Sequence, residues 1–118
     1  MNIKELIKIY QNFYSVNPML AIKSPGRINL IGEHTDYNKG LVFPAAIDKY
    51  ILFISGRNHN DTINITSLDY ETSITIDIKK ETYKKQNNWL DYFLGALKIL
   101  SKMEIKVKGF NCVIKSNI

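Results

Sequence analysis

Apolar residues recur at helical spacing at the start of the chain. With 3.6 residues per turn, they fall on one side of a helix and leave the charged positions on the other. We therefore predict an amphipathic helix over residues 3–14, which ends before the "VNP" at 16–18. The positions that form its apolar side are Ile3, Leu6, Ile7, Tyr10, Phe13 and Tyr14.

Extended chain follows this helix over a long stretch. Apolar and polar residues alternate with the period of two that is typical of strands, and asparagine and glycine mark the turns between them. The last two of these strands alternate strictly, which predicts a hairpin with one solvent-facing side. The predicted strands are 19–32, broken at Pro25 and Gly26, then 41–47, 49–58, 61–70 and 72–79.

A second helix is predicted over residues 88–103, with Asn87 or Asn88 as its N-cap. Its apolar side is formed by Trp89, Tyr92, Phe93, Ala96, Leu97 and Leu100.

The last segment, 109–118, alternates like a strand and ends on Ile118 without a turn or a polar tail. Since natural termini usually fray in polar residues, we expect this chain to be part of something longer.

Length and composition indicate one ordinary globular unit. The 118 residues are 45% hydrophobic, with a formal net charge of +5 and a pI near 9.3. The lysines are scattered and are not interleaved with aromatic residues, so they indicate a solvated surface and not a nucleic-acid partner. No apolar run approaches the length of a membrane span, and the lone Cys112 cannot form an intramolecular disulfide. We therefore predict a cytoplasmic protein without a membrane partner.

Ionisable residues gather in one short stretch, "SPGRINLIGEHTDYNKG". In an alternating strand, Arg27, Asn29 and Ile31 face one way, and the polar side ends at Glu33, His34 and Asp36. Carboxylates accept strong, charge-assisted hydrogen bonds from hydroxyl groups, which suits sugar recognition. A guanidinium on the same side can stabilise a transferring phosphoryl group.

Other interpretations of this stretch remain open on spacing alone. A metal site would need a second histidine, and the only other one, His59, lies in a turn-like "NHND". A polar corner whose charges pair with each other is a second alternative. A nucleophilic triad is a third, but Cys112 lies in a predicted strand and gives no such signal.

The stretch resembles a known family. "GRINLIGEHTDY" is similar to the galactokinase signature of the GHMP kinase superfamily, and "LVFPAAID" and "NWLDYFLGALKIL" extend the likeness. The resemblance implies an α+β fold, with a mostly antiparallel sheet and helices on one face, like the ribosomal S5 domain 2 type N-terminal half of GHMP kinases. It also implies that 1–118 is a partial N-terminal domain, with the galactose-binding signature at 24–48.

Residue roles also follow from the resemblance. Galactokinases transfer the γ-phosphate of ATP, with Mg²⁺, to the anomeric hydroxyl of galactose. Glu33, His34, Thr35 and Asp36 would bind the sugar, and Arg27 would stabilise the transition state. In "NITSLDY", Ser67 would lie near the nucleotide.

The phosphate-binding part of the family pattern is missing from these residues. The glycine- and serine-rich phosphate loop, the aspartate base and the Mg²⁺ ligands are expected beyond Ile118, in the remainder of the chain. We therefore expect the 118 residues alone to lack kinase activity. A galactose sensor on the same scaffold and an N-acetylgalactosamine kinase are the alternatives to galactokinase.

Overall fold

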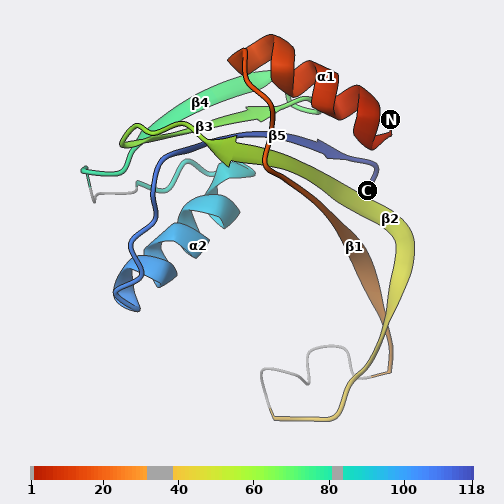
Figure 1. Cartoon of the computed structure of the whole chain (residues 1–118). Helices are drawn as coiled ribbons and strands as arrows, with labels where there is room; N and C mark the ends of the chain where they lie inside the picture. The colour runs from red at the N-terminus through yellow and green to blue at the C-terminus, as the bar shows by residue number, and fades with distance from the viewer. Residues whose placement is uncertain (1, 32–38, 81–83) are drawn as a thin grey trace.

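We describe the protein from a computed structural model, which describes residues 2–31, 39–80 and 84–118. Within these ranges, two helices and five strands follow one another in an α+β arrangement (Figure 1). Their bounds are α1 Ile3–Tyr14, β1 Leu20–Ile31, β2 Phe43–Arg57, β3 Thr62–Ser67, β4 Thr72–Asp77, α2 Leu90–Lys102 and β5 Phe110–Ser116. Neither helix is long and apolar enough to cross a membrane within the described part of the chain.

The five strands form one sheet in the order β1-β2-β5-β3-β4. The last strand is inserted in the middle, antiparallel to β2 and parallel to β3, while the other neighbours are antiparallel. The mostly antiparallel sheet and the hairpin of β3 with β4 are therefore confirmed. In place of two predicted strands, β2 is a single strand of 15 residues. Likewise β1 continues through Pro25 and Gly26, with a register shift there in place of a break.

The first helix begins and ends where its pattern predicts. Asn2 and Glu5 form a capping box, in which each side chain accepts a hydrogen bond from the other residue's backbone N–H. Leu6 and Tyr10 are fully buried and pack in a cluster with Leu52, Ile54 and Val113. This cluster fixes α1 on β2 and β5.

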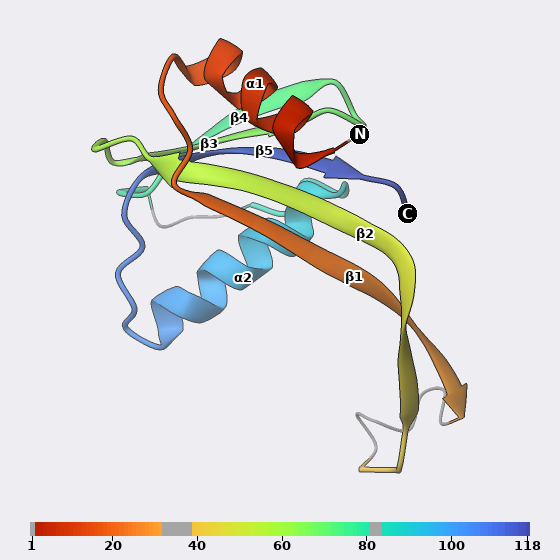
Figure 2. The same cartoon turned by 45° about the vertical axis from the view of Figure 1, so that its right-hand side comes forward.

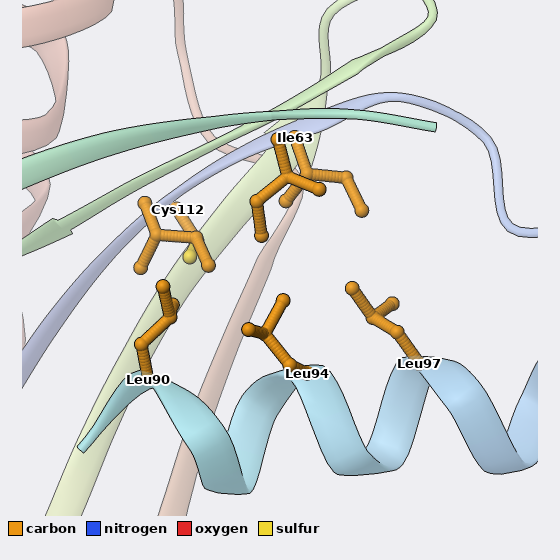
Figure 3. Packing of buried hydrophobic residues seen from close by; sticks show 7 residues of the cluster. Ile63, Leu90, Leu94, Leu97 and Cys112 are labelled. Carbon is orange, nitrogen blue, oxygen red and sulfur yellow. The ribbon is translucent and has the colours of Figure 1, made fainter. Parts of the chain in front are cut away.

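The second helix turns a different side to the sheet than its pattern predicted. Leu90, Leu94 and Leu97 are its buried residues and point at the strands (Figure 3). Their cluster includes the fully buried Ile63 and Cys112. The predicted side was rotated, because it left out Leu90 and Leu94 and included Ala96 and Tyr92, which are exposed. The asparagine cap is confirmed in part, since Asn88 Oδ1 accepts a hydrogen bond from Leu90 N at 2.9 Å, although Trp89 occupies the N-cap position.

The two helices cover opposite faces of the sheet (Figures 1 and 2). Along β5, Cys112 packs against α2 and the next residue, Val113, packs against α1. Neighbouring residues of a strand point to opposite faces, so this alternation separates the two helices. The α+β class is confirmed, but the prediction of helices on one face is wrong in that detail. Strands β2 and β5 carry apolar side chains on both faces of the sheet, and one helix packs on each face.

The hairpin of β1 and β2 extends beyond both helices and curves away from them (Figure 2). None of the residues of β1 is buried, whereas β2 is buried only from Leu52 onward, where it runs between the helices. The outer part of the hairpin, which we call the outer hairpin, is made of residues 26–31 and 43–48. It carries the strand part of the polar stretch singled out from the sequence.

Candidate functional site

The outer hairpin has one polar and one apolar face. Arg27 is the Cα partner of Ala46, and Asn29 is the partner of Pro44, so these four residues lie on one face. Ile28 pairs with Ala45, which places it on the other face. The polar face continues the side of the sheet that α1 covers, because Tyr50, Leu52 and Ile54 alternate onto it along β2. The separation of Arg27 and Asn29 from Ile28 is therefore as predicted.

Ile31 lies on the apolar face, which corrects the prediction that it faces the same way as Arg27 and Asn29. A register shift between Asn29 and Ile31 pairs Ile31 with Phe43, the residue next to Pro44. Such a bulge inserts an extra residue in one strand and changes the side on which the following residues lie. Ile31 and Phe43 are 72% and 60% exposed, so the end of the hairpin carries large uncovered apolar side chains.

Gly26 brings the hairpin close to the end of the chain. A Cβ at this position would lie 3.2 Å from Ile47 Cδ1 and 3.4 Å from Ile118 Cδ1. A side chain at this position would therefore fit only if Ile47 and Ile118 moved by a few tenths of an ångström. The Asn117 N–H also donates to the Tyr50 carbonyl at 3.1 Å, so the last residues run beside β2 toward Arg27.

Arg27 is exposed on the polar face and forms no ion pair with another described residue. Its predicted companions, Glu33, His34, Thr35 and Asp36, lie outside the described residues. The strand ends on either side of them, Ile31 and Phe43, are Cα partners. The chain therefore leaves the sheet after Ile31 and re-enters it at Phe43, at the end of the outer hairpin that carries Arg27.

Ser67 lies in a different part of the sheet. It is 3% exposed, and its Oγ accepts a hydrogen bond from the Tyr70 N–H at 3.4 Å. Ser67 is in the same row as Ile114, Phe53 and Ile22 across the sheet. Arg27 is five residues further along β1 and three strands away, which makes a separation of about 20 Å from ordinary strand dimensions. Ser67 and Arg27 therefore lie in separate parts of the sheet.

Sequence reasoning missed an aromatic pair beside Ser67. The rings of Tyr70 and Trp89 are stacked, with 5.8 Å between centroids and 7° between planes. Tyr70 is 62% exposed, and the carboxylate of Asp69 holds its turn on β5 by accepting from the Lys115 ammonium and the Ser116 N–H. Trp89 packs against the core, as predicted, but only partly. The presence of an aromatic residue, Tyr70, in the turn after Ser67 was the feature of the sequence that could have indicated this pair.

Two chemistries are not supported by the described residues. Burial raises the pKa of the Cys112 thiol to about 12, so the thiolate needed for nucleophilic attack is not formed near neutral pH. In the described ranges, no group of three histidine, cysteine, aspartate or glutamate side chains lies together in a way that could hold a metal ion. Among the described residues, the geometry instead presents a strand face that carries Arg27 and Asn29.

Comparison with solved structures gives the class of the protein. The Methanococcus jannaschii mevalonate kinase matches with a TM-score of 0.64 and 25% identity, over 84% of this chain and 32% of that chain. A Lactococcus lactis galactokinase complexed with galactose matches with a TM-score of 0.84 and 30% identity, over 98% of this chain and 31% of that chain. The fold is that of the GHMP kinases.

Sequence comparison narrows the class to one family. The model of the galactokinase galactose-binding signature matches residues 8–57. The galactokinase of Clostridium tetani is 36% identical over 118 residues, all of this chain and 30% of the relative. That of Thermosipho africanus is 36% identical over 103 residues, or 84% of this chain and 26% of the relative. The chain is therefore similar to galactokinases along its length, and it spans about 30% of the length of the curated relatives it matches.

Proposed function

We propose that this chain supplies the galactose-binding part of an ATP-dependent kinase that phosphorylates galactose at its anomeric hydroxyl. The observation that carries the proposal is the match of residues 8–57 to the galactose-binding signature. These residues include the second half of α1 and all of β1 and β2, and therefore the whole outer hairpin. The likeness to a galactokinase complexed with galactose supports the same sugar.

In this proposal, the carboxylates of Glu33 and Asp36 accept hydrogen bonds from the sugar hydroxyls, and His34 and Thr35 complete the set. A buried charge that loses its hydroxyl partner costs several kcal/mol, so such a site rejects sugars that lack a hydroxyl or carry it on the other side. The free guanidinium of Arg27, on the polar face of the same hairpin, supplies positive charge beside the reacting oxygen. The proposed domain assignment, with the signature at 24–48, follows from these roles.

Besides Arg27, the phosphoryl transfer would use groups that we expect outside the described residues. The anomeric oxygen attacks the γ-phosphorus, the bond to the β–γ bridging oxygen breaks, and ADP leaves while a base takes the hydroxyl proton. Arg27 would stabilise the charge on the equatorial oxygens, as guanidinium groups do in phosphoryl transfer. The expected base, phosphate loop and Mg²⁺ ligands stay predictions, because the described residues gather no metal-ligand set.

Ser67 is proposed to lie near the nucleotide base. Its support is the exposed ring of Tyr70, which stacks on the half-buried Trp89 beside it, since an aromatic face can stack on a base. The distance of about 20 Å to Arg27 is consistent with a nucleotide that spans from its base to its terminal phosphate. A cytoplasmic location, where ATP is available and the free Cys112 stays reduced, fits this function.

Kinetics of the whole protein test the proposal. Asp36→Ala and Glu33→Ala should raise the galactose KM and lower kcat/KM by at least about tenfold, because each removes a charged hydrogen-bond acceptor. Asp61→Ala is the matched control, since its carboxylate is exposed beyond the other end of β2 and its ion-pair partner among the described residues is Lys79, far from the outer hairpin. Unchanged constants in both variants would contradict the assigned roles. Binding of galactose without any ADP release would favour a sensor.

A further inference from the structure

A cluster of basic side chains surrounds a cavity at the opposite end of the sheet from the outer hairpin. The cavity measures about 460 Å³ and lies between the end of β2, the turn 58–61 and the segment that leads into β5. Its basic lining residues are Arg57, His59, Lys106 and Lys108. Arg57 is 14 residues from Phe43 along β2, so this site is separate from the sugar signature.

The positive charge of this cluster is not neutralised by the described residues. Asp61 is the only acidic residue of the lining, and its carboxylate already pairs with the Lys79 ammonium at 3.0 Å. Arg57, Lys106 and Lys108 form no ion pair with another described residue. Three permanent cations therefore lie around one cavity, which favours a ligand with several negative charges.

The backbone around the cavity is held in place by short-range contacts. Asn58 donates from its side chain to the Thr62 carbonyl at 2.9 Å, and its Oδ1 accepts from the Asn60 N–H at 2.9 Å. The Asn58 N–H donates to the Gly109 carbonyl at 3.4 Å, which joins the two walls. These contacts fix the backbone next to Arg57 and Lys108 before any ligand binds, which lowers the entropic cost of binding.

We propose that this cavity binds a small molecule that carries two or more phosphate groups. Guanidinium and ammonium groups are the preferred partners of phosphate oxygens, and arginine can bind them in a bidentate manner. The cations come from two separate segments, so one phosphate on each segment satisfies more of them than a single phosphate does. The volume is in the range of about 300–1,000 Å³ that is typical of small-ligand sites. The proposal does not depend on the galactokinase function.

Titration with inorganic pyrophosphate tests this site, with isothermal calorimetry on the full chain at about 0.15 M salt, where weak surface attraction is screened. We expect submillimolar binding, and at least about tenfold weaker binding of inorganic phosphate. Arg57→Gln and Lys108→Gln should each weaken pyrophosphate binding by about tenfold or more. Lys8→Gln removes the same charge from the exposed side of α1 and should change it less than twofold.

Circular dichroism of each variant verifies that the fold is unchanged. If Arg57→Gln fails to fold, the Lys108→Gln variant tests the proposal instead, because Lys108 is exposed. The proposal is overturned if pyrophosphate does not bind below about 10 mM, or if it binds no better than phosphate. It is equally overturned if Lys8→Gln weakens binding as much as Lys108→Gln, because the attraction would then come from net charge alone.

Discussion

The two halves of the sheet differ in how they are covered. Around β3, β5 and α2, side chains such as Ile63, Ile65 and Cys112 are fully buried. On the outer hairpin, Ile31 and Phe43 are more than half exposed, although they are equally apolar. The covered half thus has a core of its own, while the outer hairpin is held mainly by the pairing of β1 with β2.

This difference separates stability from ligand chemistry in the described residues. The hydrophobic contribution to folding scales with apolar area removed from water, so it comes from the covered half. Arg27 and Asn29, the polar strand residues singled out from the sequence, lie on the outer hairpin, where a change of side chain removes little buried area. Substitutions in the two halves should therefore affect different measurements.

The largest expected effect is on the free energy of unfolding. Ile65→Ala should lower it by about 2–5 kcal/mol, because the substitution leaves a cavity in the fully buried cluster under α2. Ile31→Ala, the matched change on the outer hairpin, should stay within about 0.5 kcal/mol. Urea unfolding of both variants measures the contrast, and equal losses would show that the hairpin is as well packed as the core.

Two glycines give a second, smaller contrast. A Cβ on Gly109 would lie 1.9 Å from the Asn60 carbonyl oxygen, so Gly109→Ala should cost about 1–3 kcal/mol of unfolding free energy. A Cβ on Gly95, in the exposed face of α2, meets nothing within 4 Å. Gly95→Ala should therefore stabilise the protein by about 0.5–1 kcal/mol, as helix propensity predicts. Thermal unfolding compares the two, and a stabilising Gly109→Ala would contradict the close approach of the two segments.

The smallest expected effect comes from one hydroxyl group on α1. The Tyr14 hydroxyl is 3.0 Å from Thr66 Oγ1 and donates to the Cys112 carbonyl at 3.1 Å. Tyr14→Phe should cost about 1 kcal/mol, the usual net value of such hydrogen bonds. Tyr92→Phe, whose ring is 87% exposed, should cost nothing measurable in the same urea titration. A Tyr14→Phe variant as stable as Tyr92→Phe would mean that α1 is not fixed on the sheet by this contact.

Local patterns were sufficient to predict the elements that depend on neighbours in sequence. The bounds of α1 and the hairpin of β3 with β4 follow from periodicity within a dozen residues. The side of α2 that is buried was not predicted correctly, since Leu90 and Tyr92 are both apolar enough to face a core. Only the position of the sheet decides between them.

Long-range pairing explains what the sequence could not reveal. The placement of helices on opposite faces depends on β5, which inserts between β2 and β3 although it is last in the chain. The separation of Ser67 from Arg27 depends on the same strand order. The position of Ile31 depends on a bulge beside Leu30 that no glycine marks, so strict alternation predicted the wrong face.

Amide hydrogen–deuterium exchange of the whole protein, with and without galactose, tests most directly whether the outer hairpin holds the sugar. Ligand binding to a folded site slows exchange in the segments that it stabilises. With galactose, we predict slower exchange at 27–31 and 43–48 and little change in β3, β4 and α2. Exchange that is unaffected by galactose, or slowed only in β3, β4 and α2, would contradict the assignment of the sugar site to this hairpin.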